Sequence, residues 1–180
     1  MSSAAPKLLL CLMLALLSGC PQQPRQNLIL FDFESDADLD QLRWNCRTLY
    51  SLSTEHATHG FRSLKLELFP SDYPGLLANL SVTDWRGFTT LSFDVYNPSA
   101  EPVQATVRIY DQKESYNYGE RFNRQFALSP GPNRVVIPLG QMVTSGSGRL
   151  LHAGHITRFL VYVPNPVKPI TLYLDHILLS

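Results

Sequence analysis

Two stretches of this chain place aromatic rings beside hydrogen-bonding side chains at the period-two spacing of a β-strand. The polar members of the two stretches are, in chain order, Asp94, Tyr96, Arg108 and Tyr110. Residues two apart on a strand share one face. If residues 91–111 form a hairpin, all four therefore lie on the face opposite the core, with Arg108 diagonal to Asp94. Such a face can stack rings against the C–H surface of a sugar and bind its hydroxyls through planar polar groups.

Further groups of the same kind follow the predicted hairpin. Gln125 and Asn123 lie on the next predicted strand, and Tyr116 and Tyr118 lie in the loop that leads to it. The alternative is an ordinary outer sheet surface, because tyrosine and arginine are both common in strands. A glycan-cleaving enzyme would need two convergent carboxylates about 5–10 Å apart, and the sequence places only Asp94 on this face. The pattern therefore favours binding without catalysis.

The first residues predict an export signal that ends in a modifiable cysteine. Lys7 precedes the apolar run 8–17, which is shorter than the roughly 20 residues that a membrane-spanning helix needs. The run leads into residues 17–20 (LSGC), which resemble the lipobox of bacterial lipoprotein signals. The resemblance implies cleavage before Cys20 and acylation of Cys20, and two or more acyl chains make a durable anchor. The alternative is an ordinary secretory signal with a cysteine at the cut by chance.

The predicted mature chain begins with a tether and continues as one domain. Residues 1–19 form the signal, residues 20–27 the lipidated tether and residues 28–180 the domain. Cys46 is then the only other cysteine, so no internal disulfide is expected, and its apolar neighbours predict a buried thiol. From Cys20 onward the chain has 14 basic and 15 acidic residues, which argues against a nucleic-acid partner.

Alternation of apolar and polar residues, interrupted by turn-forming Gly, Pro and Asn, predicts an all-β domain. About ten short strands are expected, at residues 28–33, 47–53, 64–68, 75–82, 91–96, 105–110, 122–128, 134–139, 158–163 and 170–178. Helical turns are expected only at residues 36–41 and 139–143. Many short strands with regular turn signals favour two antiparallel sheets packed as a β-sandwich of the jelly-roll kind.

Five segments, taken in order, resemble one kind of module. They are residues 31–34, 57–60, 91–98, 131–139 and 172–178. Their order and spacing are similar to those of the galactose-binding-like β-jelly-roll carbohydrate-binding modules that bacterial glycoside hydrolases carry. The resemblance covers nearly the whole predicted domain and implies that the outer surface of one sheet binds a glycan. The fold also hosts ligands other than sugars, so it does not fix the function.

The same resemblance implies a structural calcium ion. In these modules an acidic residue of the first strand and an Asp near the end of the last strand share the ion, and Glu34 and Asp175 fall on those positions. Asp32 lies on the same side as Glu34, and the turn at Gly60 lends a carbonyl. Oxygen ligands from distant segments suit Ca²⁺, which takes about six to eight of them. His176 stands where many relatives have a second Asp, and the alternative is a set of ordinary surface carboxylates.

Three classes of function follow from these observations. The leading one is a membrane-anchored lipoprotein whose sandwich binds a polysaccharide or envelope glycan without catalysis. The second is an envelope assembly or structural lipoprotein that uses the same sandwich to bind a protein partner, and the third is a small glycan-active enzyme. Pro21 replaces the Asp that retains lipoproteins at the inner membrane, which implies the outer membrane in a cell that has two.

Overall fold

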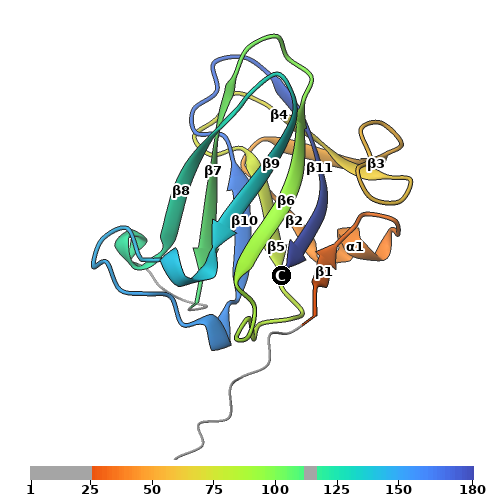
Figure 1. Ribbon diagram of the computed structural model, residues 1–180. Coiled ribbons are helices and arrows are strands. Elements are labelled where there is room, and N and C mark those ends of the chain that lie inside the picture. The colour runs from red at the N-terminus through yellow and green to blue at the C-terminus, as the bar shows by residue number, and fades with distance from the viewer. Residues whose placement is uncertain (1–25, 112–116) are drawn as a thin grey trace, which may run out of the picture.

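The computed structural model describes residues 26–111 and 117–180, which fold into two antiparallel sheets packed face to face (Figure 1). The six-stranded sheet contains β1 (Leu28–Phe31), β3 (Thr48–Ser53), β4 (Ser63–Leu68), β6 (Thr90–Asn97), β9 (Gly131–Pro138) and β11 (Ile170–Leu179). The five-stranded sheet contains β2 (Leu42–Asn45), β5 (Gly75–Asn79), β7 (Val103–Tyr110), β8 (Phe122–Leu128) and β10 (Arg158–Tyr162). The prediction of an all-β, two-sheet jelly roll is confirmed.

The strand orders show how the two sheets are built. The six-stranded sheet runs β3-β4-β11-β6-β9, with β1 paired to β11, and the five-stranded sheet runs β2-β5-β10-β7-β8. Every strand pair is antiparallel, and the last strand β11 pairs with the first strand, β1. Short helical turns occupy the connections: α1 (Ala37–Asp40), η1 (Tyr118–Glu120), η2 (Leu139–Gln141) and η3 (Ala153–His155).

The core lies between the sheets and is filled by alternate residues of each strand. Phe93 of β6 and Phe159 of β10 meet edge to face across it, with ring centroids 5.6 Å apart. Ile109 of β7 is fully buried in the same layer. Because one face of every strand is committed to this core, the polar residues between the core positions must lie on the two outer faces.

The predicted strands are all present, with ends that differ by a few residues. The prediction missed β2 at the edge of the five-stranded sheet, where Arg43, Trp44 and Asn45 give no apolar alternation. The helical turns expected at residues 36–41 and 139–143 are present as α1 and η2. No helix among the described residues is long and apolar enough to cross a membrane.

The prediction that residues 91–111 form a hairpin is wrong. β6 pairs with β9 and β11, whereas β7 pairs with β8 and β10 in the other sheet. The connection between them therefore crosses from one sheet to the other (Figure 1). The buried side chain of Asn97 donates to the carbonyl of Glu101, within the connection, and to that of Leu128 in the opposite sheet. These bonds hold the crossing, and the alternation pattern, which reports only the buried face, does not reveal it.

The prediction of a buried thiol at Cys46 is also wrong. Cys46 is exposed and adopts a φ of 53° in the turn by which the chain passes from β2 to β3. Both strands are at sheet edges, and their side chains Trp44 and Leu49 are 66% and 60% exposed. Apolar neighbours in the sequence therefore do not bury Cys46, because the strands on both sides of it are edge strands.

Candidate functional site

An open groove of about 370 Å³ lies on the outer face of the five-stranded sheet. Residues of β7, β8 and β10 and of two neighbouring loops line it: Thr106, Arg108, Asn123, Arg124, Gln125, Ser145, Tyr162 and Pro164. The strand register explains the grouping, because Arg108 lies directly opposite Asn123 on one side and Leu160 on the other. Side chains from three adjacent strands are thereby held on one rigid surface.

Arg108 is the centre of a planar polar cluster in this groove. Its Nε donates to Oδ1 of Asn123 at 2.6 Å, and its Nη2 donates to the hydroxyl of Tyr162 at 3.0 Å. The guanidinium carbon lies 5.0 Å from the centroid of the Tyr162 ring. Asn123 in turn donates from Nδ2 to Oγ of Ser145 at 3.1 Å. These contacts fix the guanidinium before any ligand arrives, which lowers the entropy cost of binding.

Aromatic rings flank the cluster at both ends of the sheet face. The guanidinium carbon of Arg121 lies 4.9 Å from the centroid of the Tyr110 ring and 4.3 Å from that of Tyr118. Tyr118 is 71% exposed. Toward the other end, Tyr73 meets Tyr162 edge to face at 5.6 Å. Rings and fixed planar donors on one face are the combination that sugar recognition uses.

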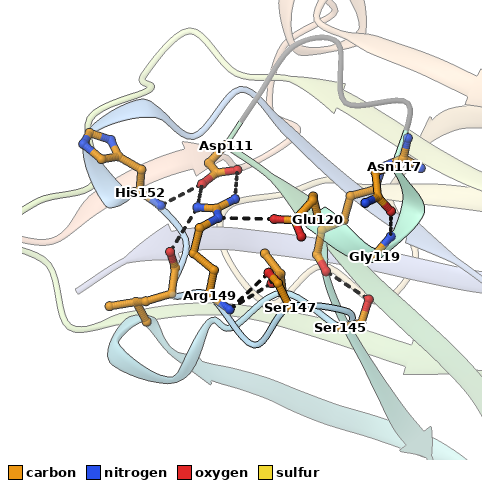
Figure 2. Close-up of polar contacts among 11 residues, drawn as sticks. Asp111, Asn117, Gly119, Glu120, Ser145, Ser147, Arg149 and His152 are labelled. Carbon is orange, nitrogen blue, oxygen red and sulfur yellow. Dashed lines mark hydrogen bonds and ion pairs between the residues drawn. The ribbon is translucent and has the colours of Figure 1, made fainter.

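An ion pair between the buried Asp111 and the partly exposed Arg149 holds the loops at the Tyr110 end of the groove (Figure 2). Asp111 is only 3% exposed. Its carboxylate accepts hydrogen bonds from both terminal nitrogens of Arg149, at 2.6 and 3.1 Å. The backbone N–H of His152 also donates to Asp111, and Nε of Arg149 donates to Glu120. Burial raises the pKa of Asp111, but the hydrogen bonds and charge of Arg149 outweigh it, so that the net pKa lies below its ordinary value.

The same loops approach each other through two glycines. The backbone N–H of Gly146 donates to the carbonyl of Gly119 at 2.7 Å, and a Cβ on Gly146 would lie 2.9 Å from the Gly119 Cα. Asn117 accepts the N–H of Gly119, and Ser145 donates from both its backbone and its hydroxyl to the carbonyl of Arg121 (Figure 2). Ser145 is therefore placed beside the groove by the loop rather than by a strand.

The outer face of the six-stranded sheet carries a second, smaller pocket of about 320 Å³. Tyr96, Asp94 and Tyr173 form part of its lining. His56 stacks on the face of Tyr96, with centroids 3.5 Å apart and planes 9° apart, and meets Tyr173 edge-on at 4.6 Å. Asp94 accepts a hydrogen bond from Arg134 at 2.8 Å. The aromatic rings of this face thus stack on one another, and its charged side chains pair with one another, which leaves few of them available to a ligand.

Tyr173 is also tied to the loop over this second pocket. Its hydroxyl donates to Oε2 of Glu55 at 2.5 Å. This hydrogen bond, together with burial and the negative charge of Glu55, raises the pKa of Tyr173 to about 12.

The structure therefore divides the predicted ligand-binding residues between two faces. Arg108, Tyr110, Tyr118 and Gln125 lie on or beside the groove of the five-stranded sheet, and Asp94 and Tyr96 lie on the opposite side of the sandwich. Arg108 is not diagonal to Asp94, because Asp94 lies between Arg134 and Asp175. Tyr116 and Cys20 lie outside the described residues.

Sequence reasoning missed several residues of the groove. Tyr162 lies in a run of five buried residues, 159–163, whose apolar character hides its orientation. Arg121 and Ser145 lie in loops, where no periodicity indicates which way a side chain points. The aromatic side chain of Tyr162 in a predicted strand was the one available signal.

The corner predicted to hold calcium does bring its three segments together. Oε1 of Glu34 accepts the N–H groups of Phe61 and Arg62, both at 2.8 Å. Oδ2 of the buried Asp175 accepts those of Thr58 and His59, at 2.6 and 2.9 Å. Glu34, three residues beyond the end of β1, and Asp175 of β11 thus hold the two sides of the turn at Gly60. The backbone hydrogen bonds from Arg62 and Phe61 lower the pKa of Glu34.

The oxygen shell that calcium prefers is not assembled at this corner. Its carboxylate oxygens face amide hydrogens, and Asp32 lies 4.0 Å from Nδ1 of His59, whose ring stacks on that of His176. Within residues 26–111 and 117–180, no three His, Cys, Asp or Glu side chains group closely enough to hold a metal. The arrangement as it stands therefore does not fit a calcium site, and the ion stays a prediction.

Comparison with known proteins yields matches in structure only. No protein-family model matches the chain, and neither does any curated protein sequence. Among solved structures, an exo-β-agarase superposes with a TM-score of 0.70 at 19% identity, over 84% of this chain. The chain spans only 25% of that agarase.

Two solved carbohydrate-binding modules match over nearly their whole length. A family 11 module from Clostridium thermocellum, in complex with a β-1,3-1,4-mixed-linked tetrasaccharide, has a TM-score of 0.63 at 17% identity, over 85% of this chain and 94% of the module. The CBM22-1 xylan-binding domain of Paenibacillus barcinonensis Xyn10C has a TM-score of 0.58 at 16% identity, over 87% and 96%. At these identities the matches establish a shared β-sandwich fold.

Proposed function

We propose that this chain is a membrane-anchored lipoprotein that binds carbohydrate without catalysis, in the groove of the five-stranded sheet. The observation that carries the proposal is the cluster in which Arg108 is fixed by Asn123 and Tyr162 on an open sheet face. The shared fold with solved carbohydrate-binding modules supports it.

The groove has unused hydrogen-bonding capacity for sugar hydroxyls. Nη1 of Arg108 forms no hydrogen bond with any residue of the described part of the chain, and Gln125 is exposed beside it. A glycan that lies across β7 and β8 accepts hydrogen bonds from these donors. At one end of the groove it contacts the rings of Tyr110 and Tyr118. Each hydrogen bond to the charged guanidinium contributes about 1.5–3 kcal/mol when water is excluded.

The anchor is the second part of the proposal. Cys20 is the acylated residue, and residues 20–27 connect the lipid to the sandwich. The signal-like layout of residues 1–20 supports this, and Pro21 directs the lipoprotein to the outer membrane where there is one. Cys20→Ser abolishes incorporation of a labelled fatty acid and leaves the chain unprocessed or released, whereas normal labelling of the variant would refute the anchor.

The binding proposal is tested by screening the protein, in detergent, against an array of plant, algal and bacterial glycans. Arg108→Lys keeps the charge but loses the planar fork, so it weakens binding to the array hit by about tenfold. Arg134→Lys is the matched control, because Arg134 lies on the opposite face and is already paired with Asp94. Equal loss in both variants would place the glycan elsewhere. Recovery of an envelope protein by crosslinking, with no glycan bound, would favour the protein-partner alternative.

A further inference from the structure

The neutral net charge of the chain hides a separation of charge between its two sheets. The strands of the five-stranded sheet carry four basic residues and no acidic one: Arg43, Arg108, Arg124 and Arg158. The strands of the six-stranded sheet carry three acidic residues and two basic ones: Glu67, Asp94, Asp175, Lys65 and Arg134. The separation appears only when the strands are sorted by sheet, because strands of the two sheets are interleaved along the chain.

The arginines of the five-stranded sheet are not neutralised by carboxylates. Among the described residues, none of the four forms an ion pair. Arg108 donates to Asn123 and Tyr162, while Arg43, within the described residues, donates to backbone carbonyls alone. The carboxylates at the end of the groove, those of Asp111 and Glu120, are taken by Arg149.

On the outer face of the six-stranded sheet, by contrast, the charged side chains are neutralised by partners within the protein. Arg134 holds Asp94 at 2.8 Å, and Asp175 accepts three backbone N–H groups. Lys65 lies 3.7 Å from Glu67 on the same strand. Cations without partners on a sheet surface raise the local potential, attract anions over about a Debye length and concentrate a ligand of opposite charge.

We infer that the glycan bound in this groove is a polyanion, with carboxylate or sulfate groups on its repeating sugars. This inference rests on the proposed function and specifies its ligand. The free Nη1 edge of Arg108 lies in the groove, and Arg158 shares its face of the sheet because it pairs with Tyr110, so one saccharide chain reaches both. A guanidinium binds a planar carboxylate or a sulfate through charge-assisted hydrogen bonds that a hydroxyl does not match in strength.

Polygalacturonate and its fully methyl-esterified form test the inference, because they differ in charge and share one backbone. The full-length protein in detergent binds the acid form at least tenfold more tightly in titration calorimetry, and added NaCl weakens only that binding. Carrageenan against agarose repeats the comparison with sulfate in place of carboxylate. Selective binding in one arm identifies which anion the groove takes, and either result supports the inference.

Two variants locate the charge dependence in the groove. The side chain of Arg158 is partly exposed and lacks an ion pair among the described residues, so the fold is not expected to depend on it, and Arg158→Gln is the first variant. It weakens binding of the acid form about threefold and reduces the salt dependence, while Arg108→Gln weakens it about tenfold. Arg134→Gln on the opposite face leaves both quantities unchanged. Selective binding that survives both groove variants would overturn the assignment to this groove.

The remaining outcomes separate this inference from the proposed function. Equal, salt-independent affinity for the acid and ester forms would overturn the polyanion inference and retain the carbohydrate-binding function. Absence of binding to any glycan would overturn both. Binding of a DNA oligonucleotide as tight as that of the anionic glycan would overturn selectivity for sugar and show only a general attraction to polyanions.

Discussion

The two outer faces of this sandwich carry the same kinds of residue and use them in different ways. On the six-stranded face, His56 covers the ring of Tyr96, Arg134 is paired with Asp94, and Tyr173 is bonded to Glu55. On the five-stranded face, Tyr118 is mostly exposed and Arg108 is held by neutral groups. A tyrosine and an arginine on a strand are therefore not by themselves a binding site, because their neighbours decide whether they are available.

The difference yields a simple expectation. Groups that are satisfied within the protein contribute to stability, so their removal changes unfolding and leaves ligand affinity unchanged. Groups held in place but not fully satisfied contribute to binding, so their removal changes affinity and leaves unfolding nearly unchanged. The variants below test this separation, from the largest expected effect to the smallest.

The pair of Asp111 and Arg149 at the end of the groove is expected to give the largest loss of stability. Asp111→Ala leaves the guanidinium of Arg149 and the N–H of His152 without their acceptor. Loss of these hydrogen bonds to a charged carboxylate lowers the free energy of unfolding by about 3 kcal/mol, measured by urea unfolding. Asp94→Ala, which removes a more accessible carboxylate, costs about 1 kcal/mol. A larger loss for Asp94→Ala would reverse the ranking of the two faces.

The contribution of Asp111 also fixes a pH dependence. The folded pKa of Asp111 lies below its ordinary value of 3.8. Its stabilising effect is therefore complete above pH 3.8 and is lost as the pH falls through the lower folded pKa. The difference in unfolding free energy between wild type and Asp111→Asn should shrink over that acid range.

The corner of Glu34 and Asp175 gives the next test, because the family resemblance implies a calcium ion there whereas the carboxylates already accept amide hydrogen bonds. An ion that binds only the folded chain stabilises it by about 2.7 kcal/mol at a hundredfold excess over Kd. If calcium is bound, a chelator lowers the melting temperature of the wild-type protein. Asp175→Ala removes this sensitivity to the chelator. Identical melting curves with and without chelator would contradict the calcium prediction. Within the described residues, the amide hydrogen bonds would then account for the connection between these segments.

The fold could be read from the sequence much further than the site could. Alternation and turn residues indicated every strand but β2 and placed the core faces, because burial imposes a period of two on each strand. The assignment of β6 and β7 to different sheets depends on bonds made by Asn97 to a strand distant in sequence. No local pattern contains that information, and the predicted ligand face combined two surfaces for this reason.

Paired tyrosine variants test the separation by affinity. Tyr110 and Tyr96 are both half-buried tyrosines on outer faces, one beside the groove and one under His56. Tyr110→Ala weakens binding of the glycan found on the array by about tenfold to a hundredfold, and it shifts the melting temperature little. Tyr96→Ala shows the opposite pattern. Lost affinity in Tyr96→Ala alone would move the binding site to the six-stranded face.

The smallest effect concerns a single hydrogen bond on the six-stranded face. Tyr173→Phe removes the donor to Glu55 and so lowers the free energy of unfolding by about 1 kcal/mol at pH 7, without changing glycan affinity. The pKa of Tyr173 is raised from 10.0 to about 12 in the folded chain. A raised folded pKa means that the stabilisation is complete below pH 10 and is lost as the pH rises through 12. The gap between wild type and Tyr173→Phe should therefore narrow between pH 10 and pH 12 in urea unfolding. A gap that stays constant over that range would show that the ring packing, and not the hydroxyl, ties this face to its loop.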